Sequence, residues 1–382
     1  MRTAHVLAAL AMTSADRLVT RALHRALPLW MQHGMRDSGL LGVSVDMATI
    51  AGAAAALAAR PAALTRLVRA SATSRLGVAY GPLPQHRLDI FEPAPLHAPA
   101  RPAPDVIVFV HGGAWGSGSR LIYRLVGERL AAEGFTCLVL GYRRYPRASM
   151  EEQVNDVARA LEWAADSAEF GERARHVLGH SSGAHVASMA VMRRARARLA
   201  PLCSSLTGVA GVYDIARHLD FERGRGVHEV SPMKPAAGGP ANFAAASPAI
   251  AASQLLREQA ALLPPVLLVH GTKDTTVPHD SSVRMAIALR AAGARDVDLI
   301  ILSENGHADF MLELSGLVDE RRFDVLGERG AGTGAQMRTL DPILRLIASC
   351  GRAAPHSSVD LGECPPGAAS AHPIPPVVRS KL

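Results

Sequence analysis

The residues Gly179-His180-Ser181-Ser182-Gly183 constrain the fold of this chain more than any other stretch. They follow the apolar residues Val177 and Leu178 and precede a run of small residues that is typical of a helix. A sharp turn from a strand into a helix would lift the Ser181 hydroxyl out of the backbone, and glycine permits such a turn. The free N–H groups of the helix N-terminus would then lie beside that hydroxyl. The motif taken alone would also fit an ordinary Gly/Ser loop.

Strand and helix patterns alternate on both sides of this motif. The sequence predicts strands at 86–91, 105–111, 136–142, 176–180, 205–212, 265–270 and 297–302. It predicts helices at 119–133, 150–167, 182–194, 280–292 and 308–317. Strands that are separated by helical crossovers form a mostly parallel sheet with right-handed connections. We therefore expect an α/β fold whose ligand site lies at the carboxyl ends of the strands.

A glycine-rich turn follows the predicted strand at 105–111 and reads His111-Gly112-Gly113-Ala114-Trp115-Gly116. Negative charge develops on a carbonyl oxygen when a hydroxyl attacks an ester, and preorganised backbone N–H groups stabilise that charge. We expect the N–H groups of Gly113, Ala114 and Ser182 to form this oxyanion hole. Trp115 is expected either to line the substrate pocket or to pack in the core.

Two more polar residues follow predicted strands in the second half of the chain. Asp274 ends the stretch His270-Gly271-Thr272-Lys273-Asp274, and His307 lies in a loop after the strand at 297–302. An aspartate can hold an imidazole in one tautomer, and the imidazole can act as general base for a serine. We therefore expect Ser181, Asp274 and His307 to form a catalytic triad in that chain order. His270 is expected to be structural.

Four segments together resemble the α/β-hydrolase superfamily over about residues 80–320. They are His-Gly-Gly-Ala-Trp at 111–115, Gly-His-Ser-Ser-Gly-Ala-His at 179–185, His-Gly-Thr-Lys-Asp at 270–274 and Asn-Gly-His-Ala-Asp-Phe at 305–310. Two stretches are similar to those of esterases of the prenylcysteine methylesterase and kynurenine formamidase type. They are the second of these segments and Tyr142-Arg143-Arg144-Tyr145-Pro146. The hormone-sensitive-lipase group would have glycine at Ala114. The resemblance implies an α/β-hydrolase fold with flanking helices and a small cap insertion.

The expected reaction is hydrolysis of a carboxylic ester through an acyl-enzyme on Ser181, with no metal and no organic cofactor. The resemblance implies a hydrophobic substrate such as a prenylcysteine methyl ester. A triad does not distinguish ester from amide cleavage, so a formamidase or amidase of the kynurenine formamidase type is an alternative. A non-catalytic hydrolase-fold protein that binds a lipid or a partner is another, because fold does not guarantee function.

The chain is expected to have three parts. Residues 1–75 would form a helical extension for targeting or for a membrane surface. Residues 76–320 would form the catalytic domain, in which the insertion 213–263 has no strand pattern and is expected to cap the site. Residues 321–382 would form a C-terminal extension with a flexible, proline-rich tail.

The two ends give different indications of location. Residues 1–36 contain Asp16 as their only acidic residue and predict a basic amphipathic helix, which suits a membrane surface, a transit peptide or packing on the catalytic domain. The apolar stretch 47–59 is shorter than the roughly 20 residues that a membrane span needs.

The terminal Ser380-Lys381-Leu382 matches a peroxisomal address. The expected compartment is therefore the peroxisome or a glycosome-like organelle, and the expected partner is its import receptor. Association with the endoplasmic reticulum membrane and a cytoplasmic location are the alternatives.

Charge and cysteine content exclude some classes of function. The net charge is +7, but no basic run is interleaved with aromatic residues, so we expect no nucleic-acid partner. The 4 cysteines form no Cys-x-x-Cys pair, which indicates neither a disulfide framework nor a metal site. A reducing compartment fits this pattern.

Overall fold

The computed structural model describes residues 65, 74–93, 104–229, 231–316, 323–324, 336–337 and 340–350. The expected N-terminal helix, the stretch 47–59 and the Ser380-Lys381-Leu382 terminus lie outside these residues. Within the described part of the chain, no helix combines the length and the hydrophobicity that crossing a bilayer requires.

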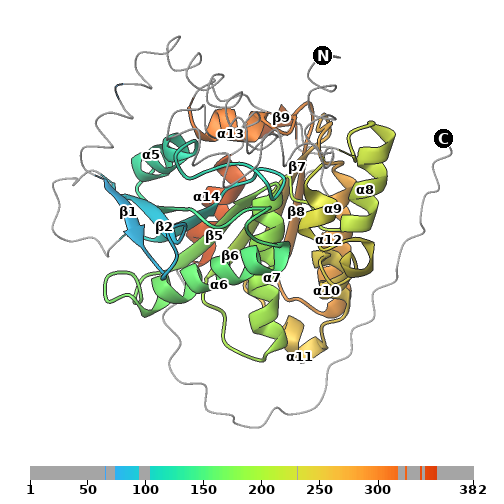
Figure 1. Cartoon of the computed structure of the whole chain (residues 1–382). Coiled ribbons are helices and arrows are strands. Elements are labelled where there is room, and N and C mark those ends of the chain that lie inside the picture. Colours follow the sequence, from blue (N-terminus) through green and yellow to red (C-terminus); the bar gives the residue numbers. More distant parts are fainter. Residues whose placement is uncertain are drawn as a thin grey trace, which may run out of the picture. The chain divides into compact units, whose positions relative to one another are not determined.

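One sheet of eight strands, in the order β1-β2-β4-β3-β5-β6-β7-β8, forms the centre of the fold (Figure 1). The strands are β1 (Arg75–Ala79), β2 (Arg87–Phe91), β3 (Val106–Val110), β4 (Thr136–Leu140), β5 (Arg175–His180), β6 (Ser205–Val209), β7 (Val266–Gly271) and β8 (Val297–Leu302). The pairs β1–β2 and β2–β4 are antiparallel, and every pair from β4 to β8 is parallel. The predicted mostly parallel α/β sheet is therefore confirmed, with the unexpected edge strand β1.

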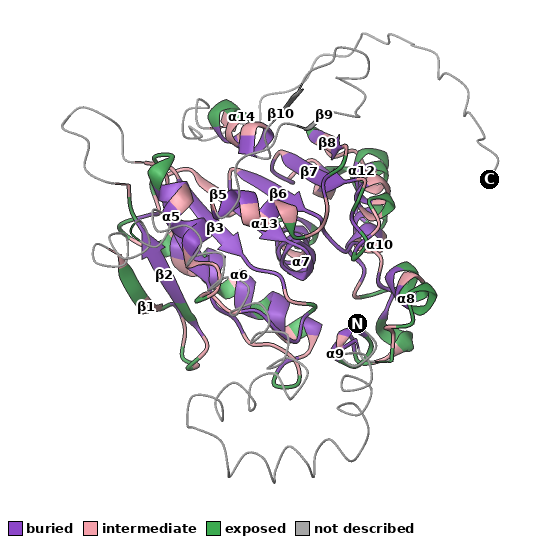
Figure 2. Ribbon diagram, turned by 90° about the horizontal axis from the view of Figure 1, so that it is seen from above, coloured by how far each residue is buried: buried purple, intermediate pink, exposed green. Residues whose placement is uncertain are grey.

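The strand sequences explain why the sheet is covered on both faces. Along β3, Val106, Val108 and Val110 belong to one core cluster, and the intervening Ile107 and Phe109 belong to the other. A strand whose two faces are both buried has an unbroken apolar sequence, because alternate side chains point to opposite faces. Figure 2 shows these central strands buried along their length, whereas β1 at the edge is largely exposed.

Two sets of helices cover the two faces. One core cluster contains side chains from α6 (Met150–Asp166), α7 (Ser182–Arg196), α10 (Pro248–Ser253) and α12 (Asp280–Ala292). The other includes α5 (Arg124–Ala132), α13 (Asp309–Leu314) and α14 (Leu340–Cys350). The helix expected at 119–133 thus begins only at Arg124. Helix α6 begins where predicted, because Ser149 and Glu152 form a reciprocal capping box at its N-terminus.

The described residues of the insertion at 213–263 form short helices that are joined by turns and loops. Its further helices are α8 (Ile215–Gly224), α9 (Met233–Ala236), the short 3₁₀ helix η1 (Pro240–Asn242) and α11 (Arg257–Ala260). Asp214 begins α8 by accepting a hydrogen bond from the N–H of Arg217. The expected absence of strands in this segment agrees with its described residues.

Strands β3 and β5 lie side by side, although the chain passes through β4 between them. The strand order therefore reverses at this pair, and open α/β sheets bind ligands in the crevice that such a reversal creates. Two glycines allow the turns after these strands to touch. A Cβ on Gly183 would lie 2.2 Å from the Val110 oxygen, and a Cβ on Gly112 would lie 2.9 Å from the Ser181 Cβ. Only glycine fits such distances.

Helix α14 lies beyond residue 320, where the catalytic domain was expected to end. Its Leu340, Ile343 and Ile347 are buried in the same core cluster as the sheet residues Ile107 and Phe109. The short strands β9 (Phe323–Asp324) and β10 (Gln336–Met337), which precede it, pair antiparallel. The helix therefore belongs to the core that covers the sheet.

We expect Ile343→Ala to lower the free energy of unfolding by about 2–4 kcal/mol, because a buried isoleucine would be replaced by a cavity. The exposed Arg345 on the same helix provides the control, and Arg345→Ala should change stability by less than about 0.5 kcal/mol. The midpoint of urea unfolding measures both effects. Equal midpoints for the two variants would show that α14 does not contribute to the core.

Candidate active site

Ser181 stands between the last residue of β5 and the first residue of α7. Its backbone has φ 55° and ψ −125°, a conformation that a residue with a side chain seldom adopts. The Ser181 N–H donates to the Val209 oxygen over 2.9 Å, and the Ser181 carbonyl accepts from the N–H of Ala184 over 3.0 Å. The side chain makes no capping hydrogen bond to its helix. The hydroxyl is therefore left to contact another group.

That other group is the imidazole of His307, in the loop between β8 and α13. His307 Nε2 lies 3.0 Å from Ser181 Oγ, and His307 Nδ1 lies 2.7 Å from Asp274 Oδ2. Because a carboxylate only accepts, Nδ1 carries the proton and Nε2 is left to accept from the serine hydroxyl. The structure thus brings together the three side chains that the sequence placed in one site.

The Asp274 carboxylate is held at both of its oxygens. Oδ1 accepts from the N–H groups of Thr276 and Val277, each over 2.8 Å. Oδ2 accepts from His307 and also lies 3.2 Å from His270 Nε2. Burial alone would raise the pKa of Asp274, but the hydrogen bonds from the two histidines outweigh it and hold this pKa well below its usual value.

His270 contacts the same Asp274 oxygen as His307, Oδ2. It is fully buried, and its Nε2 also lies 3.0 Å from the Val277 oxygen. Both neighbours of Nε2 are acceptors, so Nε2 carries the proton and Nδ1 accepts from the Ser282 hydroxyl over 2.8 Å. Burial lowers the pKa of His270, which keeps the ring neutral. His270 is structural, as expected, and the structure adds that it helps to orient the Asp274 carboxylate.

A third histidine, His180, packs against His307. The two ring centroids are 4.9 Å apart, and His180 Nε2 donates to the His307 carbonyl oxygen over 3.2 Å. Burial lowers the pKa of His180 to about 3, so its ring is neutral. We predicted no role for His180 from the sequence. Its place directly before Ser181 was the available signal, because the strand end that presents the serine also faces the loop of His307.

The turn after β3 holds an unusual backbone conformation. Gly113, Ala114 and Trp115 have φ values of 139°, 48° and 61° in succession. The Gly113 carbonyl oxygen accepts from the N–H of Gly116, and from both the N–H and the hydroxyl of Ser117, over 2.8–3.1 Å. In a trans peptide the C=O and N–H point in opposite directions. Fixing the Gly113 carbonyl therefore fixes the direction of the Ala114 N–H.

His111 fixes the preceding peptide in the same way. Its Nδ1 donates to the Gly112 carbonyl oxygen over 2.8 Å, which orients the N–H of Gly113. Burial lowers the pKa of His111 to about 3, so the ring is a neutral donor. The Ser182 N–H belongs to the first turn of α7, where backbone donors have no acceptor within the helix. The three expected oxyanion donors thus belong to backbone of defined direction.

Trp115 was expected to contact substrate, with a core position as the alternative. Its side chain is 2% exposed and lies in the core cluster of α6 and α7. The indole N–H donates to His185 Nδ1 over 3.1 Å, and His185 Nε2 donates to the Ala246 carbonyl oxygen over 2.7 Å. The structure therefore corrects the substrate-contact assignment, because the ring packs in the core behind the glycine turn.

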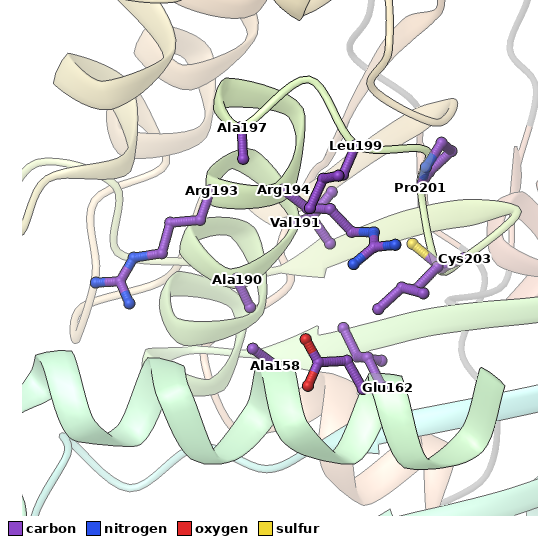
Figure 3. Close-up of a pocket in the computed structure, with 12 residues that line it drawn as sticks. Ala158, Glu162, Ala190, Val191, Arg193, Arg194, Ala197, Leu199, Pro201 and Cys203 are labelled. Carbon is purple, nitrogen blue, oxygen red and sulfur yellow. The ribbon is translucent and has the colours of Figure 1, made fainter. Parts of the chain in front are cut away.

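A cavity of about 200 Å³ lies elsewhere, between α6, the C-terminal half of α7 and the loop that follows it (Figure 3). Ala158 and Glu162 line it from α6, and Ala190, Leu199 and Cys203 line it from the other side. Ser181 precedes the opposite end of α7. This cavity is separate from the Ser181 site.

The described residues contain no group of three or more His, Cys, Asp or Glu side chains that could hold a metal ion.

Comparison with known proteins adds a family assignment. The sequence model of the BD-FAE family matches residues 88–289, which is more than half of the chain. The chain belongs to the BD-FAE family. The part that matches the BD-FAE model contains Ser181 and Asp274, and His307 follows it.

Curated relatives of this BD-FAE chain carry esterase names. It is 31% identical over 250 residues to the probable isoprenylcysteine alpha-carbonyl methylesterase ICME of Oryza sativa subsp. japonica, covering 62% of this chain and 58% of the relative. It is 30% identical over 269 residues to the ICME of Arabidopsis thaliana, covering 66% and 61%. It is 31% identical over 254 residues to esterase LipC of Mycobacterium tuberculosis, covering 63% and 60%. The chain therefore spans about three fifths of the length of these relatives.

Solved structures with the same fold are also esterases by name. Esterase B of Lactobacillus rhamnosis, inhibited by a tributyrin phosphonate, superposes with a TM-score of 0.55 at 17% identity, covering 80% of this chain and 96% of that one. A second structure of esterase B superposes with a TM-score of 0.52 at 18% identity, covering 70% and 89%. The BD-FAE chain thus has the α/β-hydrolase fold that the sequence predicted.

The lowered pKa of Asp274 has a consequence for stability. The ionised carboxylate stabilises the folded state fully above the unfolded pKa of about 3.9, and this stabilisation is lost as the pH falls below that value toward the lower folded pKa. We therefore expect the stability difference between the native chain and Asp274→Asn to narrow by about 1 kcal/mol between pH 6 and pH 3. Urea unfolding at both pH values measures it, with the exposed Asp296→Asn as control. A difference that stayed constant with pH would contradict the lowered pKa.

Proposed function

We propose that this chain is a serine esterase that hydrolyses a carboxylic ester through an acyl-enzyme on Ser181. The observation that carries the proposal is the continuous contact from Ser181 Oγ through His307 to Asp274. It lies beside the turn of Gly113 and Ala114, whose N–H groups have fixed directions. The esterase names of the relatives support the same reaction.

In the first half of the reaction, Ser181 Oγ attacks the carbonyl carbon of the ester. His307 Nε2, 3.0 Å away, takes the hydroxyl proton, and Asp274 stabilises the imidazolium that forms. Negative charge collects on the carbonyl oxygen, where the N–H groups of Gly113, Ala114 and Ser182 stabilise it. Each such donor contributes roughly 3–4 kcal/mol to the transition state.

In the second half, His307 returns the proton to the leaving alcohol, and the acyl group remains on Ser181 Oγ. Water then attacks the acyl carbon while His307 takes a proton from it. Collapse of the second tetrahedral intermediate releases the acid and restores the serine hydroxyl. Asp274 stays ionised throughout, which agrees with a pKa held well below the usual value.

For the substrate we propose a hydrophobic ester, with the methyl ester of a prenylated cysteine as the first candidate. The resemblance of the segment at 179–185 to prenylcysteine methylesterases supports this candidate. So do the isoprenylcysteine methylesterase names of the relatives from rice and Arabidopsis.

Replacement of Ser181 by alanine should abolish covalent labelling by a fluorophosphonate probe, because the hydroxyl is the nucleophile. The native chain and Ser188→Ala should both be labelled; Ser188 lies on the same helix and its hydroxyl is also buried. Intact-mass measurement of the three proteins after exposure to the probe gives the result. Equal labelling of Ser181→Ala and the native chain would exclude Ser181 as the nucleophile.

Turnover of three compounds should separate ester from amide hydrolysis. We expect kcat/KM to be highest for a prenylcysteine methyl ester, lower for p-nitrophenyl acetate and lowest for N-formylkynurenine, since pocket contacts and not the triad decide between them. His307→Ala should reduce all measurable rates by several orders of magnitude. Preferential turnover of N-formylkynurenine would instead identify a formamidase.

A further inference from the structure

Helix α8 of the insertion buries two polar side chains on its inward face. Its buried residues are Ile215, His218, Leu219 and Glu222, the spacing of one helical face. His218 and Glu222 are each 7% exposed. Burying an imidazole and a carboxyl costs free energy unless hydrogen bonds replace those to water.

The pair is only partly satisfied. Glu222 Oε1 accepts from the Ser231 hydroxyl over 2.8 Å and lies 3.5 Å from His218 Nε2. Ser231 Oγ is itself held by the N–H of Met233 over 3.3 Å. The buried atoms His218 Nδ1 and Glu222 Oε2 have no hydrogen-bond partner among the described residues. Buried polar atoms in folded proteins are normally paired, so each of these two atoms is available to a hydrogen-bond donor from another molecule.

The segment that holds the pair contacts two loops of the Ser181 site. Pro232, next to Ser231, packs on the oxyanion turn so closely that a Cβ on Gly116 would lie 2.9 Å from the Pro232 Cγ. Arg225, at the end of α8, donates to the Thr276 carbonyl oxygen over 3.4 Å, in the loop that carries Asp274. Helices α8 and α9 lie side by side in both views (Figures 1 and 2). The insertion thus contacts both the glycine turn and the loop that carries Asp274.

The chemistry of the two atoms defines what they can bind. Burial lowers the pKa of His218 to about 4, with a smaller effect of the charge on His307, so the imidazole is neutral at pH 7. Its Nε2 faces a carboxylate oxygen and therefore carries the proton, which leaves Nδ1 as an acceptor. Glu222 Oε2 is also an acceptor when the carboxyl is ionised. Each of these two acceptors fits a group that donates a hydrogen bond.

We propose that His218 and Glu222, braced by Ser231, form a subsite for an O–H or N–H group of the substrate close to the scissile ester. This inference rests on the proposed esterase function and deepens it. The preferred substrates are then esters with a hydroxyl or amide N–H group near the ester. A plain aliphatic ester leaves both acceptors unpaired in the complex, which lowers its kcat/KM.

Two pairs of matched esters test the subsite and distinguish the two donors. For the hydroxyl, 2-hydroxyethyl butyrate is compared with n-propyl butyrate, which has a methyl group in place of the O–H. For the amide, N-acetylalanine methyl ester is compared with methyl 2-methyl-4-oxopentanoate, which has CH₂ in place of N–H. We expect the native chain to favour the donor in at least one pair by about tenfold in kcat/KM, the effect of one hydrogen bond.

His218→Phe should bring the preferred pair to a ratio near one, because phenylalanine keeps the size of the ring and removes Nδ1. Glu222→Gln keeps the shape of the side chain and should reduce the ratio independently. The matched control is His228→Phe, since His228 lies beside Glu229 in the same insertion but its side chain is 30% exposed. This control should keep the native ratio. A ratio does not depend on the fraction of folded enzyme.

Ratios near one for the native chain in both pairs would overturn the subsite, and so would a native ratio that persisted in His218→Phe and Glu222→Gln. Either result leaves the esterase function intact. If the native chain cleaved none of the four esters and Ser181 resisted the fluorophosphonate, the proposed function would fail and the subsite with it. Loss of preference in the two variants, with retention in His228→Phe, supports the subsite.

Discussion

The close approach of the turns after β3 and β5 is the constraint on which the rest of this structure depends. The proposed oxyanion amides follow β3 and the proposed nucleophile follows β5, so the two turns must touch for one carbonyl group to reach both. Gly112 and Gly183 permit the contact, because any side chain at either position would collide with the facing turn. The strained backbone at Ser181 and at Ala114 is maintained by this packing.

The polar groups next to the reacting residues include three neutral histidines and the ionised carboxylate of Asp274. Asp274 accepts hydrogen bonds at both oxygens, whereas burial keeps His111, His180 and His270 uncharged. Each of these three rings donates to a carbonyl or carboxylate oxygen next to a reacting group. Fixed dipoles next to the ionised Asp274 suit the proposed reaction, in which charge would appear on His307 and on the substrate oxygen.

The parts of the fold that could be predicted from the sequence are those with strong local patterns. Apolar runs such as Val106–Val110 identified the parallel strands, and a reciprocal cap at Ser149 and Glu152 fixed the start of α6. The mixed sequence of β1, Arg75–Ala79, gave no such pattern, because an edge strand is only partly buried. Helix α14 was missed for a different reason: its amphipathic pattern lies beyond the last recognised motif, and only tertiary packing ties it to the sheet.

The same distinction holds within the site. Ser181, Asp274 and His307 were predictable because each follows a strand in a recognisable motif. Trp115 could not be placed, since an aromatic residue after a strand fits a pocket wall and a core equally well. His218 and Glu222 gave no signal at all, because a helix with a mixed sequence does not reveal which of its polar residues face inward.

The chain of hydrogen bonds from Trp115 through His185 to Ala246 has a mechanical consequence. It joins the glycine turn, the helix that follows Ser181 and the insertion through the side chains of Trp115 and His185, which are 2% and 1% exposed. If the segment at Ala246 moved away, the buried N–H of His185 would lose its hydrogen-bond acceptor. This loss costs about 1–3 kcal/mol. The hydrogen bond from His185 therefore favours an arrangement in which the Ala246 segment stays next to α7.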